Sequence, residues 1–195
     1  MKQVAPVYGK DFGPGFAMFT KSDSNLISNG ISWFGSLQEA VTFSASHVVL
    51  VVNHLIGIEA AAQGIQYCRI DQRIEDPGLQ IVFREPVDLT KKAAGQAIDY
   101  AVSRIGRPYD YSGLALGFPL MIASGLSKWI KPLRKFPVPF HLPGSRVCSA
   151  AVADDYKHTD QYRDEPLLRN WHVSRITPVM LWNDFPFKPF RFEEH

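Results

Sequence analysis

The segment 47–52, with the sequence His-Val-Val-Leu-Val-Val, constrains the fold more than any other part of the chain. Its β-branched, apolar side chains are typical of a strand that is covered on both faces. After a short polar turn, 55–61 predicts a second strand that runs antiparallel to the first. Strands are also predicted at 16–20, 65–70 and 79–84. Because turn residues separate the strands from 47 onward at hairpin spacing, we expect those strands to form a meander.

Two longer helices are predicted after these strands. Thr90 begins the first, in which alanine and isoleucine recur on one face at helical spacing. Gly106 suits the position just beyond its end, and Pro108 blocks its continuation. The second begins at about Cys148, because Ser145 is a suitable N-cap and small or apolar residues follow it. Strands and helices arranged in this way indicate an α+β protein.

The pattern is weaker toward the C-terminus. Residues 157–168 are polar and predict a loop. Residues 171–176 predict a strand, and 177–181 predict a short helical turn. None of these segments looks like a linker between two domains.

The chain of 195 residues is long enough for one domain with a substantial core. We therefore predict a single domain over 1–195, with an insertion at about 112–143 that is apolar first and then basic and proline-rich. Its apolar run is shorter than the roughly 20 residues that a membrane-spanning helix needs. The favoured interpretation is a segment packed on the domain or over its cleft. The alternative is peripheral membrane contact through 113–135, because basic residues flank the apolar run.

Composition argues against several classes of function. The formal charge is +2, without a long run of like charges, so nucleic-acid binding is not expected. No cluster has the spacing of metal ligands and no glycine-rich phosphate loop occurs, so neither a metal nor a cofactor is predicted. Residues 1–11 contain no apolar signal region, so a cytoplasmic location is the default expectation, with a bacterial or phage-encoded origin.

Cys148 is the first candidate for chemistry. The unpaired N–H groups and the positive end of the dipole in the first turn of a helix favour a thiolate there. The alternative is an inert core cysteine, which is the commoner role of a buried thiol. The other cysteine, Cys68, lies in an alternating strand pattern and is interpreted as structural.

A nucleophilic thiol needs a base, and His47 is the best placed of the histidines because it opens the most hydrophobic strand. Glu59 is the only acid within either strand of the first hairpin, and the two residues are expected to lie nearly opposite each other. A buried glutamate needs a partner, so Glu59 would orient the His47 ring. The alternatives are a core histidine without a catalytic role and an exposed glutamate at a sheet edge.

The order of four short motifs carries a resemblance. They occur at 46–52, 58–60, 106–110 and 147–149, and include Ser-His-Val-Val, Ile-Glu-Ala, Gly-Arg-Pro-Tyr-Asp and Val-Cys-Ser. In this order the chain resembles the circularly permuted branch of the NlpC/P60 papain-like superfamily, which contains YiiX-like and lecithin:retinol-acyltransferase-like proteins. In unpermuted members the histidine strand follows the cysteine helix, whereas here it precedes it.

The resemblance implies a papain-like fold in which an antiparallel sheet packs against a nucleophile-bearing helix and a second helix. It also implies a cysteine hydrolase of the amidase or peptidase type, with a triad of Cys148, His47 and Glu59. The bond cleaved would be an amide or an ester, and peptidoglycan stem peptides are the usual substrate class. Tyr109 would contact the substrate or the oxyanion, or else pack on the sheet as a turn residue. The chain departs from the family at Val147, where unpermuted members often have an acid, and in the insertion.

Two other functions stay open. The permuted branch includes lipid-directed members, so an acyltransferase or thioesterase that takes a lipid-like substrate is one alternative. A non-catalytic structural or binding module, for example a component of a phage particle, is the other. The sequence leaves the oligomeric state undetermined.

Overall fold

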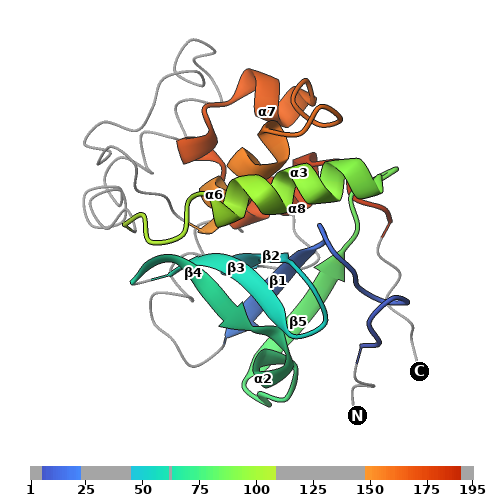
Figure 1. Ribbon diagram of the computed structural model, residues 1–195, viewed down its shortest axis with the longest axis vertical. Coiled ribbons are helices and arrows are strands. Elements are labelled where there is room, and N and C mark those ends of the chain that lie inside the picture. The colour runs from blue at the N-terminus through green and yellow to red at the C-terminus, as the bar shows by residue number, and fades with distance from the viewer. Residues whose placement is uncertain (1–5, 23–44, 62, 109–147, 190–195) are drawn as a thin grey trace.

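The computed structural model describes residues 6–22, 45–61, 63–108 and 148–189. It is an α+β structure, as predicted, in which one antiparallel sheet lies beneath a layer of helices (Figure 1). In chain order the elements are β1 (Ala17–Ser22), β2 (His47–Val51), β3 (Ile56–Ala61), β4 (Gly64–Arg69), α2 (Ile70–Ile74), β5 (Leu79–Arg84), α3 (Lys91–Val102), α6 (Cys148–Lys157), α7 (Pro166–Asn170), η2 (Val173–Arg175) and α8 (Pro178–Asp184). The predicted positions Ser145 and Tyr109, and the insertion at 112–143, lie outside the described residues.

The sheet has five strands in the order β4-β3-β2-β1-β5. The predicted meander is confirmed for β2, β3 and β4, which are neighbours in sequence and in space. It is wrong for β5, which pairs with β1 at the opposite edge of the sheet rather than with β4. The reason is the short helix α2, which the sequence pattern did not predict. It replaces the expected hairpin turn and carries the chain to the other edge (Figure 1).

Side chains alternate between the two faces of the sheet, as the strand period requires. On the helical face, Val48 and Leu50 of β2 join the main core with α3, α6 and α8. On the other face, Val49 and Val51 pack in a smaller cluster with Ile70 of α2. Strand β2 is therefore covered on both faces, as its apolar sequence predicted.

Helix α3 begins as predicted, because the Thr90 side chain accepts a hydrogen bond of 3.1 Å from the backbone N–H of Ala93. Its buried face consists of alanines, among them Ala97 and Ala101, spaced one helical turn apart. Small side chains let α3 and α6 approach closely. Gly106 follows with φ of +85°, a conformation that glycine adopts without steric cost.

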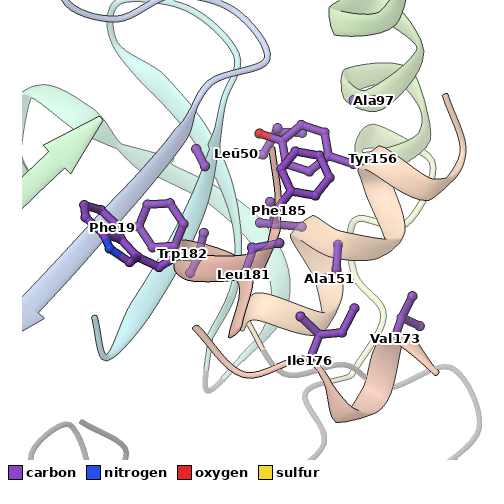
Figure 2. Packing of buried hydrophobic residues seen from close by; sticks show 14 of the residues in the cluster. Phe19, Leu50, Ala97, Ala151, Tyr156, Val173, Ile176, Leu181, Trp182 and Phe185 are labelled. Carbon is purple, nitrogen blue, oxygen red and sulfur yellow. The ribbon is translucent and has the colours of Figure 1, made fainter. Parts of the chain in front are cut away.

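Helix α6 contacts β2 and β3 of the sheet as well as α3, α7, η2 and α8, and nearly all of its residues are buried. Figure 2 shows Ala151 and Tyr156 of this helix in the core, with Leu181 of α8 and Phe185 nearby. The Tyr156 hydroxyl donates a hydrogen bond of 2.9 Å to the backbone carbonyl of Gly15. This bond satisfies a buried polar group and joins the end of α6 to the segment that precedes β1.

The C-terminal predictions are partly wrong. The predicted loop at 157–168 contains the start of α7, where Pro166 occupies a first-turn position that suits proline. The predicted strand at 171–176 is instead the short 3-10 helix η2, which packs against α6. The predicted turn at 177–181 is confirmed as α8, whose N-cap is Thr177. Within the described ranges, none of the helices combines the length and the apolar character needed to cross a membrane.

Candidate active site

Cys148 is the first residue of α6, and its side chain is buried. The backbone N–H groups of Val48, from β2, and of Ser149 both face its sulfur. Helix α6 contacts both β2 and β3, and the hydrogen bond from the Val48 N–H places the second residue of β2 beside the first residue of α6. These donors and the helix dipole stabilise negative charge on the sulfur.

His47 is the first residue of β2, directly before Val48, and its ring is hydrogen-bonded to the Cys148 thiol. The Nε2 atom lies 2.6 Å from the Oε2 atom of Glu59. Because Nε2 is engaged by this carboxylate, Nδ1 is the ring nitrogen left to face the sulfur. About 23% of the His47 side chain is exposed, so the ring lies at the border between core and solvent.

Glu59 lies in β3 and is only 3% exposed. Its Oε2 atom accepts a second hydrogen bond, of 2.7 Å, from the Nη2 atom of Arg73 in α2. Its Oε1 atom accepts a longer bond of 3.4 Å from the side-chain amide of Gln66 in β4. The buried carboxylate therefore has polar partners from three different elements, which lowers the cost of burying its charge.

The register of the hairpin differs slightly from the prediction. Leu50 pairs with Ile58, and this register, when continued, places Val49 opposite Glu59. His47 and Glu59 are therefore diagonal neighbours on one face rather than nearly opposite residues. They are nevertheless hydrogen-bonded, because a glutamate side chain is long enough to reach a diagonal neighbour.

Electrostatics in the site favour an ion pair between thiolate and imidazolium. Burial alone would lower the pKa of His47, but the negative charge and hydrogen bond of Cys148, followed by those of Glu59, raise it to about 9. Burial alone would raise the pKa of Cys148, yet the charge and hydrogen bond of His47 bring it below its usual value. For Glu59, burial opposes ionisation, but His47 and then Arg73 lower the carboxyl pKa. The arrangement can supply a nucleophilic sulfur and a proton donor side by side.

Cys68 provides a contrast within the same chain. It lies in β4, next to Gly57 of β3, and is half-buried. Burial, together with the nearby charge of Glu59, raises the pKa of its thiol to about 12. The two thiols are thus shifted in opposite directions, because the pKa of Cys68 rises whereas that of Cys148 falls.

Sequence reasoning missed two residues at this site. Gln66 pairs directly with Glu59 across β3 and β4, so the register of the second hairpin was a signal that could have identified it. Arg73 gave no comparable signal, because it lies in α2, a five-residue helix with no recognisable amphipathic pattern. Tyr109, the predicted substrate contact, lies outside the described residues.

A buried charged cluster joins α6 to α3. Arg104 follows α3 and is hydrogen-bonded to two carboxylates of α6, Asp154 at 3.1 Å and Asp155. It also donates a bond of 3.0 Å to the backbone carbonyl of Ala151. All three charged residues are at most 5% exposed. Because removal of one member of such a cluster leaves buried charge uncompensated, it fixes α6 against α3.

In the described part of the chain, histidine, cysteine and acidic residues do not form a group of three that could hold a metal ion. Comparison with protein-family models, with curated proteins and with solved structures finds no match. Function is therefore inferred from the residues of the site and their geometry.

Proposed function

We propose that this protein is a cysteine hydrolase of the amidase or peptidase type, with a permuted papain-like fold. The observation that carries the proposal is the buried Cys148 thiol, hydrogen-bonded to His47, whose far nitrogen lies 2.6 Å from the buried carboxylate of Glu59. These residues come from α6, β2 and β3. A nucleophile, a base and a group that orients the base are the parts that thiol catalysis needs.

In the first half of the reaction, the Cys148 thiolate attacks the substrate carbonyl carbon and forms a C–S bond. The carbonyl π electrons move to oxygen. As that oxyanion collapses, the bond to the leaving nitrogen or oxygen breaks, and the His47 imidazolium gives its proton to the leaving group. A thioester on Cys148 and a neutral His47 result.

In the second half, neutral His47 takes a proton from water, and the hydroxide formed attacks the thioester carbonyl. The C–S bond breaks, which releases a carboxylic acid and regenerates the thiolate beside the imidazolium. Glu59 holds the Nε2–H tautomer and stabilises the cation each time it forms. Backbone N–H groups at the start of α6 would stabilise the oxyanion, by roughly 3 kcal/mol per donor in other enzymes.

The substrate class follows from the resemblance rather than from the geometry. An amide in a peptidoglycan stem peptide is the first candidate, and a lipid-like amide or ester is the second. A lipid-like substrate and membrane contact would involve 113–135, which lies outside the described residues.

Thiol reactivity tests the proposal without a known substrate. Alkylation by iodoacetamide, followed residue by residue with mass spectrometry from pH 5 to pH 10, compares Cys148 with Cys68 in one sample. We expect Cys148 to react well below pH 8, where Cys68 remains protonated. His47→Ala should return the Cys148 profile to that of an ordinary thiol.

Turnover provides the second half of this test. An activated ester such as 4-nitrophenyl acetate should give a burst of product, because acylation of Cys148 precedes hydrolysis of the thioester. Cys148→Ala should abolish the burst, whereas Cys68→Ala should keep it. If Cys148 alkylates only as readily as Cys68 and Cys148→Ala leaves ester hydrolysis intact, the hydrolase proposal is wrong.

A further inference from the structure

One carboxylate oxygen of Glu59 is hydrogen-bonded to both His47 and Arg73. The Oε2 atom lies 2.6 Å from Nε2 of His47 and 2.7 Å from Nη2 of Arg73. The other oxygen has only the weaker, 3.4 Å bond from Gln66. Both short bonds are charge-assisted when the partners are ionised, and such bonds are about twice as strong as neutral ones. The guanidinium of Arg73 is thus a direct neighbour of the atom that orients the proposed base.

The need for a second cation follows from the proposed reaction. After acylation His47 has lost its proton, and Glu59, at 3% exposure, then faces a neutral ring. A buried carboxylate without a cationic partner tends to take up a proton instead. Arg73 is charged at every stage, so it can compensate Glu59 while His47 cannot.

We propose that Arg73 is a positioning residue that keeps Glu59 ionised and in place while His47 is neutral. The ring proton then stays on Nε2, and Nδ1 remains free to accept the proton from water. This inference rests on the proposed hydrolase function. Arg73 would act through Glu59 and His47 and would not touch the substrate.

The alternative role for Arg73 is to tether α2 to the sheet. That helix already has other contacts, because Ile70 is fully buried against Val49 and Val51, on the face of the sheet opposite the helical layer. At its start, Arg69 forms an exposed ion pair with Asp71. A tether would change stability without changing how His47 titrates, so the two roles predict different results.

The experiment follows the His47 ring directly. The Cys148→Ala background removes the sulfur, so that ¹⁵N NMR reports how Glu59 and Arg73 act on the imidazole. In this background Arg73→Gln should raise the pKa of His47 by about one unit, because a nearby positive charge is lost. Just above that pKa the Nε2–H tautomer should also lose its dominance, because without Arg73 the Glu59 carboxylate is no longer held in place to accept the Nε2–H hydrogen bond.

Three further variants complete the test. Arg73→Lys keeps the charge and should restore most of the His47 titration. Arg69→Gln is the matched control, because it removes an exposed arginine from the preceding strand without touching Glu59, and it should leave His47 unchanged. Arg73→Met retains the apolar stem and replaces Arg73→Gln if amide spectra show that the glutamine variant does not fold.

An unchanged pKa and tautomer of His47 in the neutral Arg73 variants would overturn the inference, as would a lysine variant that behaves like glutamine. This outcome is separate from the fate of the proposed function. The alkylation profile of Cys148 tests the hydrolase, whereas the NMR titration is made without that thiol. An active hydrolase with an unaltered His47 titration would leave Arg73 as a tether of α2.

Discussion

Asp155→Asn should change the pH dependence of stability. Asp155 is 2% exposed and shares the single guanidinium of Arg104 with Asp154. Burial raises the pKa of Asp155 from 3.8 to about 8, because it outweighs the charge of Arg104, and the charge of Asp154 adds to the rise. One proton in the cluster offsets the extra negative charge that two carboxylates would place against one cation.

The sign follows from linkage. Between pH 4 and 8 folded Asp155 holds a proton that the unfolded chain has released, so stability falls as pH rises. The stabilisation is complete below the unfolded value of 3.8 and is lost as pH rises through about 8. One proton corresponds to about 1.4 kcal/mol per pH unit. Asparagine resembles the protonated acid and does not titrate, so its stability relative to the parent should increase by about 3 kcal/mol from pH 5 to 7.

Urea denaturation at pH 5, 6 and 7, followed by tryptophan fluorescence, measures this difference. Asp160→Asn is the matched control, because Asp160 is exposed and its hydrogen bond with Lys92 lowers its carboxyl pKa to about 2. That carboxylate is ionised in both states from pH 5 to 7, so its variant should differ from the parent by a constant amount. A constant difference for Asp155→Asn as well would mean that folded Asp155 is ionised and that its pairing with Arg104 outweighs burial.

Three further variants test other parts of the structure. Glu59→Gln removes the charge beside His47, so the pKa of His47, about 9 in the parent, should fall by about one unit. The alkylation rate of Cys148 changes at high pH when His47 loses its proton, so the midpoint of that change measures this pKa. An unchanged midpoint would contradict the pairing of Glu59 with His47. Gly57→Ala places a Cβ 2.5 Å from a methyl carbon of Val49 and should cost about 1–3 kcal/mol in urea denaturation, whereas unchanged stability would mean that the strands can separate freely. Arg104→Met leaves two carboxyl groups buried without their cation, so it should cost about 3–5 kcal/mol at pH 7, and a loss below 1 kcal/mol would show that the cluster does not hold α6.

Local sequence patterns predicted the regular elements of the core well. The apolar run that became β2 and the alanine face of α3 both had a clear period, and their caps or turns were conventional. For the candidate site, the same patterns selected Cys148, His47 and Glu59, which the structure brings into contact. Each choice used a local property, such as a helix start or an acid inside a strand.

Non-local contacts decided what the patterns missed. Helix α2 has five residues, too few to be stable alone, and it exists because Ile70 packs beneath the sheet. Its presence moves β5 to the far edge and brings Arg73 to Glu59, neither of which hairpin spacing could indicate.

By itself, then, the sequence determined which segments become the core strands and the two longer helices and which residues are candidates for chemistry, because periodicity and capping act within a few neighbouring residues. Only the tertiary structure decided which strand borders which, and which charges face the Glu59 carboxylate. Those outcomes depend on burial shared between distant segments, and the physical reason is that a buried charge selects its partners only after the core has formed around it.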